Sequence, residues 1–181
     1  MSVSIVLVDP KYPHNVGAAV RAASCFGASD VLFTGSRVRL DAGVASPKGV
    51  RLPREERMKG YKDVRLRHVP EDVVFDRLPD TSTPVAVELR ASAEQLPQFE
   101  HPEHATYVFG PEDGSLTRAH LRHCHRVVLI PTRHCINLGA AVYVMLYDRL
   151  VKRQAAGEEP VLASWDVLDE DRGFIEALGL S

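Results

Sequence analysis

The sequence predicts one α/β domain, spanning residues 1–181, with a mostly parallel sheet flanked by helices. Short runs rich in Val and Ile alternate with helix-like segments, which is typical of parallel strands joined by helical crossovers. These runs show little alternation between apolar and polar residues, which indicates strands buried on both faces. With 181 residues, 45% of them hydrophobic, the chain is long enough to bury one sizeable core.

The first part of the chain predicts a strand, a helix and a second strand, expected at residues 3–8, 16–26 and 31–34. Pro13 and Asn15 are residue types that begin helices, and Gly27 is the type that ends them. Residues 41–69 are interrupted by Pro and Gly and are expected to be mostly loop, with a short helical piece at residues 54–61.

The second part of the chain predicts three more strands and two helices. The strands are expected at residues 84–89, 107–109 and 127–130, and the helices at residues 117–123 and 139–154. The last helix is the clearest, because its apolar residues recur at the spacing of one core-facing stripe. After it, residues 155–181 are acidic and are expected to form a tail of the same domain.

Positive charge is concentrated in two blocks, although the net charge is only −2. Residues 37–69 hold ten Lys and Arg against four acidic residues, and residues 114–153 hold seven against Asp148 alone. Two basic blocks around polar loops suit a polyanionic partner, because each neutralised phosphate releases counterions and adds affinity. The composition is equally compatible with a solvated surface that carries scattered arginines.

The sequence also bears on compartment and membrane contact. The longest apolar run, residues 138–147, is shorter than the roughly 20 residues that span a bilayer, so no membrane association is expected. The first residues begin a strand and lack the basic start of a signal peptide. Three cysteines without framework spacing indicate reduced thiols and a cytoplasmic setting.

Three short polar segments follow predicted strands, where open α/β sheets place their ligand sites. They are Asn15 with Gly17 and Arg21, then Phe109-Gly110-Pro111-Glu112, and finally Ile130-Pro131 with Cys135-Ile136-Asn137-Leu138. Together they offer two amides, one guanidinium and one carboxylate among small residues. This combination suits a polar cofactor and a phosphate-bearing partner.

Each of these polar residues also has a structural interpretation. Arg21 has no acidic residue within one helical turn, so it is either a site residue or an arginine that extends to water at a helix edge. Asn15 and Asn137 either cap their helices or direct an amide at a ligand. Glu112 either belongs to a tight turn or holds an amine or hydroxyl of a partner.

Several other kinds of site are not expected. Six His and Cys residues between 120 and 135 invite a zinc interpretation, but Cys124 and His125 are adjacent, which strains joint tetrahedral ligation, so no metal is expected. Glycine-rich dinucleotide and triphosphate motifs are absent from the sequence. A serine nucleophile in a G-x-S-x-G elbow is absent as well.

Taken in order, the three polar segments resemble the three motifs of the SpoU-type RNA 2′-O-ribose methyltransferases of the SPOUT superfamily. The resemblance covers nearly the whole chain and is strongest to the small TrmL-like tRNA wobble-position enzymes. It implies an α/β sheet with a C-terminal trefoil knot, one of the rare exceptions to unknotted topology. It further implies a homodimer that binds S-adenosylmethionine in the knot and acts on RNA.

The resemblance assigns a role to each matching residue. Arg21 would contact the RNA and assist loss of the 2′-hydroxyl proton through orientation and charge, because its very high pKa makes it a poor base. Asn15, Glu112 and Asn137 would be the other catalytic residues, holding the geometry around Arg21. The residues expected to bind the cofactor are Val87, Gly110, Ile130, Cys135, Ile136 and Leu138.

The function implied is transfer of a methyl group from S-adenosylmethionine to a ribose 2′-hydroxyl of RNA, foremost of tRNA. Cys135 stands where the family usually has Ser, and the loop at residues 132–134 looks short. Both departures bear on cofactor affinity, and they keep open a non-catalytic RNA-binding protein of the same fold. Methylation of rRNA and an unrelated small-ligand site are also compatible with the sequence.

Overall fold

A computed structural model describes residues 2–38 and 64–158 of the chain. These residues form a seven-stranded sheet in the order β3-β2-β1-β6-β4-β7-β5, and each described pairing is parallel. The strands are β1 (Val3–Leu7), β2 (Asp30–Phe33), β3 (Arg65–His68), β4 (Thr83–Val87), β5 (Glu94–Gln95), β6 (Ala105–Phe109) and β7 (Arg126–Leu129). The expected parallel α/β sheet is thus confirmed, while the helical piece at residues 54–61 lies outside the described residues.

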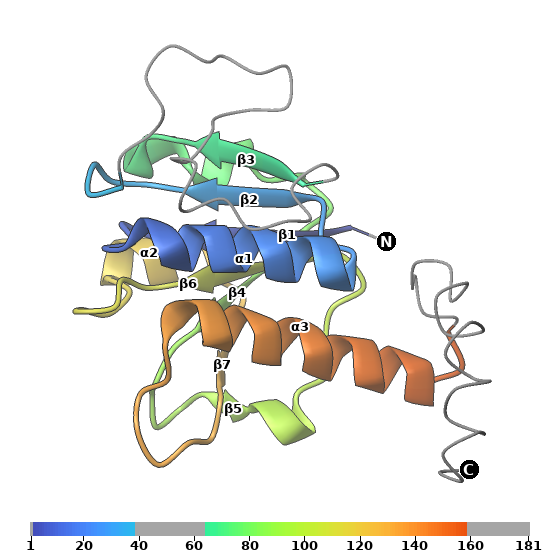
Figure 1. The fold of residues 1–181 in the computed structure, drawn as a ribbon. Coiled ribbons are helices and arrows are strands. Elements are labelled where there is room, and N and C mark those ends of the chain that lie inside the picture. The colour runs from blue at the N-terminus through green and yellow to red at the C-terminus, as the bar shows by residue number, and fades with distance from the viewer. Residues whose placement is uncertain (1, 39–63, 159–181) are drawn as a thin grey trace, which may run out of the picture.

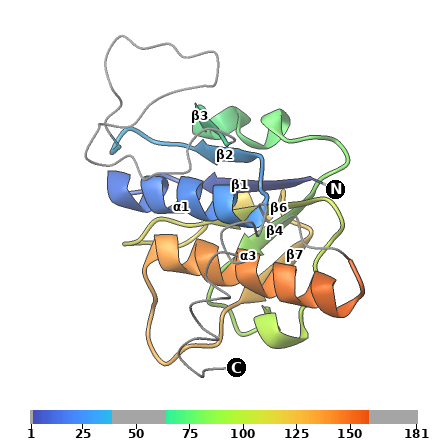
Figure 2. The same ribbon diagram turned by 45° about the vertical axis from the view of Figure 1, so that its right-hand side comes forward.

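Helices cover both faces of this sheet. The helical elements are α1 (Pro13–Phe26), η2 (Glu71–Val73), η3 (Phe75–Arg77), η4 (Leu96–Gln98), α2 (Arg118–Leu121) and α3 (Leu138–Ala155). Figures 1 and 2 show α1 and α3 side by side across one face. The short elements α2, η2 and η3 belong to a second apolar cluster on the other face. No described helix is long and apolar enough to cross a membrane.

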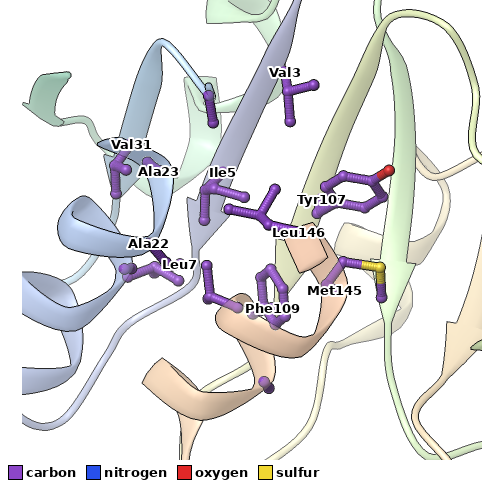
Figure 3. Packing of buried hydrophobic residues seen from close by; sticks show 14 of the residues in the cluster. Val3, Ile5, Leu7, Ala22, Ala23, Val31, Tyr107, Phe109, Met145 and Leu146 are labelled. Carbon is purple, nitrogen blue, oxygen red and sulfur yellow. The ribbon is translucent and has the colours of Figure 1, made fainter. Parts of the chain in front are cut away.

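The two apolar clusters follow the alternation of side chains along each strand. Ile5 and Leu7 of β1 pack toward α1 and α3, whereas Val6 points to the opposite cluster. In β6, Phe109 likewise joins the first cluster and Val108 the second. Figure 3 shows the first cluster, with α3 residues lying over β1 and β6. Burial on both faces explains why these strands read as continuous apolar runs.

Two edge strands are missing from the sequence-based prediction. In β3, Leu66 is buried while Arg65 and Arg67 direct their guanidinium groups to Asp30 Oδ1, at 3.3 and 3.2 Å. The strand β5 consists of two exposed polar residues, Glu94 and Gln95. The Arg126 guanidinium donates two hydrogen bonds to the Glu94 carboxylate. Neither segment carries a run of apolar residues, because an edge strand buries little of its surface. The other strands agree with prediction to within two residues at each end.

The helix ends decide the structural role of both asparagines. Helix α1 begins at Pro13, three residues earlier than predicted, after the N-cap Tyr12. Asn15 lies inside the first turn and is 1% exposed, so the interpretation of Asn15 as a cap is wrong. Asn137 is a cap, because its Oδ1 accepts from the Ala140 N–H at 3.2 Å. Gly27 ends α1 in the left-handed conformation as expected.

The middle of α3 is tied to the segment that precedes β6. The buried Arg149 donates hydrogen bonds to the carbonyl oxygens of Pro102 and Glu103. His101 lies between the Tyr107 hydroxyl and Asp148, and burial lowers its pKa to about 4. Arg149 therefore belongs to the interior of the protein. The basic block at residues 114–153 is thus not a free cationic surface throughout its length.

The start of α3 meets α1 at very close range. A Cβ atom on Gly139 would lie 2.6 Å from the Cβ of Ala18, which is shorter than real carbon–carbon contacts allow. Glycine at position 139 and alanine at position 18 therefore let the two helices approach each other. This approach brings the first turn of α1, which carries Asn15, next to Asn137.

We predict that Gly139 and Ala18 are energetically coupled. In the wild-type protein, Ala18→Gly costs about 1 kcal/mol of unfolding free energy, because glycine disfavours helices. In the Gly139→Ala background, Ala18→Gly instead recovers about 1–3 kcal/mol, because it relieves the overlap of the two Cβ atoms. Urea unfolding of the four proteins measures both effects. An equal cost of Ala18→Gly in the two backgrounds contradicts this packing argument.

Candidate functional site

An open cleft of about 240 Å³ lies at the carboxyl ends of β4, β6 and β7. This is the edge of the sheet where open α/β folds bind ligands. Each residue that the sequence analysis selected for the cofactor lines the cleft: Val87, Gly110, Ile130, Cys135, Ile136 and Leu138. Glu112 lines it as well. The structure thus brings the second and third polar segments together around one cavity.

The wall of the cleft depends on close backbone packing at Gly110. A Cβ atom there would lie 3.2 Å from the Leu116 nitrogen, so a side chain would force the loop between β6 and α2 to shift. Two apolar side chains remain exposed among its lining residues, Leu89 at 57% and Ile136 at 38%. Apolar walls around a few fixed polar groups are typical of small-molecule sites.

Glu88 is a cleft residue that the sequence analysis missed. Its carboxylate accepts from the Leu116 N–H at 2.8 Å and from the Leu89 N–H at 2.9 Å. These bonds fix a negative group in the lining of the cavity. The sequence analysis placed Glu88 inside the strand expected at residues 84–89 and gave its side chain no role, although an acidic residue in an otherwise apolar strand was a usable signal.

Three side chains from the three polar segments form one hydrogen-bonded chain beside the cleft. Asn137 Nδ2 donates to Asn15 Oδ1 at 2.8 Å, and Asn15 Nδ2 donates to Glu112 Oε1 at 2.5 Å. The other carboxylate oxygen, Oε2, accepts from the Lys11 N–H at 2.7 Å. Asn15 is buried, so each polar atom of its side chain needs the partner that it has.

The direction of this chain is fixed by its two ends. An ionised Glu112 only accepts hydrogen bonds, so Asn15 must present its amide nitrogen to it. Asn15 then presents its oxygen to Asn137, which must donate. The oxygen of Asn137 is left for the first turn of α3, where the Ala140 N–H needs an acceptor. Both amide orientations therefore follow from chemistry.

The environment of Glu112 favours its ionised form. Burial on its own raises the pKa of the Glu112 carboxyl, but the Lys11 N–H and the Asn15 amide stabilise the carboxylate and leave the pKa below its ordinary value. Glu112 therefore carries a negative charge at neutral pH. That charge lies at the edge of the cleft and adds to that of Glu88.

Arg21 lies apart from this cluster. Its side chain is exposed on α1, it is not among the lining residues of the cleft, and it pairs with no acidic residue in the part of the chain that the structure describes. Its neighbour is Tyr143 of α3, whose pKa is raised by burial and held back by the Arg21 guanidinium. Arg21 is thus exposed next to α3 and does not reach the cleft.

Within residues 2–38 and 64–158, no group of three His, Cys, Asp or Glu side chains is arranged to hold a metal ion. Cys124 is half-buried and burial raises the pKa of its thiol to about 11, while Cys25 and Cys135 are exposed. The polar groups that the described cleft does offer are two carboxylates, the hydroxyls of Ser115 and Thr132, one thiol and backbone groups. These groups suit an elongated organic ligand with donors and a positive charge.

We predict that Glu112→Gln destabilises the protein at neutral pH by about 1–3 kcal/mol. The amide nitrogen of the new glutamine would face either the Lys11 N–H or the Asn15 amide nitrogen, and both of these groups are donors. The pKa of Glu112 is depressed on folding, so its contribution is complete above the unfolded pKa of about 4.3 and disappears as pH falls through the folded pKa. The difference between mutant and wild type in urea unfolding should therefore shrink toward acid pH. If the difference in unfolding free energy between mutant and wild type does not depend on pH, the charge of the Glu112 carboxylate is not the cause of the stabilisation.

Comparison with solved structures shows how widely this architecture occurs. A structure from work on the 2-OH methylation of C/U34 on tRNA is 25% identical and covers 87% of this chain and 98% of its own, with a TM-score of 0.64. The AdoMet-bound rRNA methyltransferase from Sinorhizobium meliloti shares the fold at 17% identity and a TM-score of 0.61. That match covers 85% of this chain and 56% of the other, so this chain spans little more than half of that protein.

Comparison of sequences identifies the family. The tRNA (cytidine/uridine-2'-O-)-methyltransferase TrmJ of Yersinia pestis is 26% identical over 198 aligned positions, which cover 98% of this chain and 73% of that protein. The model of the SpoU rRNA Methylase family matches residues 2–147 and so includes all three polar segments. Because this match spans most of its length, the chain belongs to the SpoU rRNA Methylase family.

Proposed function

We propose that the protein transfers a methyl group from S-adenosylmethionine to a ribose 2′-hydroxyl of RNA, foremost of tRNA. The observation that carries this proposal is that two of the family segments line one cleft, and that Asn15 of the first segment is hydrogen-bonded to both of them. The similarity to a tRNA 2'-O-methyltransferase supports tRNA as the substrate. The wobble nucleotide is supported by the related structure that concerns C/U34 of tRNA.

The cleft provides a suitable site for the cofactor. S-adenosylmethionine supplies an already activated methyl group, so the protein has to bind, orient and desolvate the reactants. Val87, Ile130 and Leu138 would contact its apolar parts, and the backbone at Gly110 would approach it closely. The carboxylates of Glu88 and Glu112 complement the positive charge of a sulfonium donor. The AdoMet-bound neighbour of the same fold is consistent with this assignment.

The RNA would be bound and oriented by the remaining residues. Arg21 carries an exposed charge without an acidic partner among the described residues, which suits a phosphate or ribose oxygen, and it would act by orientation and charge because a guanidinium is a poor base. Asn15, Glu112 and Asn137 hold the geometry on which the target hydroxyl depends. Holding reactants in near-attack geometry supplies on the order of 7–11 kcal/mol of the barrier in favourable cases.

Methylation of rRNA is the second candidate. The name of the matching family and the Sinorhizobium meliloti neighbour favour it, because both refer to rRNA. The same cleft and hydrogen-bonded chain serve either substrate, since the reacting group is a ribose hydroxyl in both. Nucleoside analysis of separated tRNA and rRNA fractions after reaction distinguishes the two.

A homodimer, which the family resemblance implies, is part of the proposal. The outer face of α3 exposes Val144, Tyr147 and Val151 at 39%, 58% and 41%. Phe26 of α1 packs edge-on against Tyr147, so this apolar surface continues onto α1. An apolar strip of this kind on paired helices suits a twofold contact between copies. A protein that sediments as a monomer at micromolar concentration would contradict it.

The C-terminal trefoil knot is a further part of the proposal. Its support is that β7 pairs with the interior strand β4, and that the chain then passes the cleft at residues 130–137 before α3 packs on α1. We also propose that residues 1–181 form one domain, with the acidic tail belonging to it. The three free thiols support the proposed reducing, cytoplasmic setting.

We predict that S-adenosylmethionine protects Cys135 from a thiol-reactive maleimide. Cys135 lines the cleft, so saturating cofactor should slow its labelling about tenfold or more. Cys25 is equally free and exposed but lies outside the lining, so its labelling is the internal control and should not change. Cys124 should react slowly throughout, because its raised pKa leaves little thiolate. Mass spectrometry of the three peptides reads all rates, and equal protection of Cys25 and Cys135 would argue against binding in the cleft.

We predict that Arg21→Ala lowers methyl transfer to RNA by about 10²–10³-fold and leaves cofactor affinity unchanged. Transfer is measured with labelled cofactor and total cellular RNA, followed by nucleoside analysis, and affinity by calorimetry. Arg118→Ala, which removes an exposed charge from α2 on the opposite face, is the matched control and should transfer normally. Transfer at the wild-type rate by Arg21→Ala would refute its role. A wild-type protein that binds cofactor but labels no 2′-O-methyl nucleoside would instead point to a non-catalytic RNA-binding protein.

A further inference from the structure

Two cations next to Glu112 are held at the surface by acidic partners. Lys11 Nζ lies 3.3 Å from Asp113 Oδ2, and Arg37 Nη1 lies 2.9 Å from Asp113 Oδ1. Arg37 Nε also lies 3.1 Å from Asp9 Oδ2. The four side chains are between 31% and 47% exposed, so water screens their charges. Exposed pairs of this kind contribute little to stability, and their partners are exchangeable.

An exposed aromatic pair stands beside these cations. The rings of Tyr12 and His14 are stacked, with centroids 5.3 Å apart and planes inclined by 19°. Tyr12 is 44% exposed, and the ammonium group of Lys11 lies 5.4 Å from the centre of its ring. Proteins hold single-stranded nucleic acid by stacking bases on aromatic rings and pairing phosphates with cations. Both kinds of group are adjacent here.

This surface is joined to the hydrogen-bonded chain through the backbone. The Lys11 N–H donates to Glu112 Oε2, while the Lys11 side chain pairs with the next residue, Asp113. Tyr12 is the N-cap of α1, whose first turn carries Asn15. An RNA strand bound by these side chains would therefore lie close to Asn15 and Glu112, which are proposed to orient the target ribose.

From this geometry we propose that Lys11, Tyr12, His14 and Arg37 bind the RNA strand beside the target nucleotide. The proposal rests on the function proposed above and names the RNA contact of the same site. Tyr12 and His14 stack on one base, and Lys11 and Arg37 exchange the carboxylate of Asp113 for an RNA phosphate. A phosphate offers the same acceptor oxygens as a carboxylate. The released Asp113 is already half exposed, so water solvates it at little cost.

The exchange gives Asp113 the role of a competitor, which a purely structural ion pair would not have. Asp113→Asn should tighten RNA binding by about 1.5- to 5-fold, because it removes the carboxylate that pairs with Lys11 and leaves Arg37 with Asp9 as its acidic partner among the described residues. Lys11→Gln should weaken binding and lower the slope of log Kd against log salt by about 0.7–0.9, since one phosphate contact is lost. If the ion pairs only held the loops together, Asp113→Asn would weaken binding instead.

The stacking contact is tested by a matched pair of variants. Tyr12→Ala should weaken RNA binding about tenfold, whereas Tyr12→Phe, which keeps the ring, should bind like the wild type. Fluorescence anisotropy with labelled unfractionated tRNA, and in parallel with ribosomal RNA, measures all variants over a series of salt concentrations. Calorimetry with S-adenosylmethionine serves as the folding control, because no variant alters a residue that lines the cleft.

The outcomes separate this site from the proposed function. If the wild type methylates RNA but Tyr12→Ala and Lys11→Gln bind it with unchanged affinity, the site proposed here is wrong and the function stands. If Asp113→Asn weakens binding, the exchange is wrong. A wild-type protein that binds neither tRNA nor ribosomal RNA overturns both. The site is supported if Asp113→Asn binds RNA more tightly and Tyr12→Phe, unlike Tyr12→Ala, binds it with wild-type affinity.

Discussion

The hydrogen-bonded chain from Asn137 through Asn15 to Glu112 is the constraint on which the site depends. It joins the start of α3, the first turn of α1 and the loop after β6, which are remote in sequence. A hydrogen bond to a charged group contributes about 1.5–3 kcal/mol, and leaving the buried amide of Asn15 unpaired would cost a similar amount. These three segments therefore hold one another in place.

Helix α3 connects this constraint to the rest of the fold. At its start, Gly139 permits the close approach to Ala18 that puts the two asparagines within bonding distance. In its middle, Arg149 is fixed to the carbonyl oxygens that precede β6. The helix is thus secured at two points to the elements that carry the cleft. Both terminal nitrogens of the buried Arg149 donate hydrogen bonds, whereas its Nε has no partner among the described residues.

The sequence was sufficient to predict what depends on local pattern. Buried strands appear as apolar runs, whereas the residues that line the cleft were named from the family resemblance, and their contact with a cofactor stays a prediction. Other features depend on tertiary contacts and leave no local pattern. Asn15 is a residue type that caps helices, but here its buried side chain connects Asn137 to Glu112. The strand β3 is held in the sheet partly by the ion pairs of Arg65 and Arg67 with Asp30. Glu88 was not singled out, because the bond that it accepts from the Leu116 N–H comes from a loop far along the chain.

The chemical nature of the chain limits what it can do in the reaction. Two of its three members are carboxamides, whose N–H groups do not titrate in water and whose oxygens already accept hydrogen bonds. A proton released at one end therefore has no path through Asn137 and Asn15 to the carboxylate of Glu112. The hydrogen-bonded chain therefore fixes the positions of these side chains but does not conduct protons along its length. The proton of an attacking hydroxyl therefore does not travel through these two amides, and Glu112 could receive it only by direct contact within the cleft.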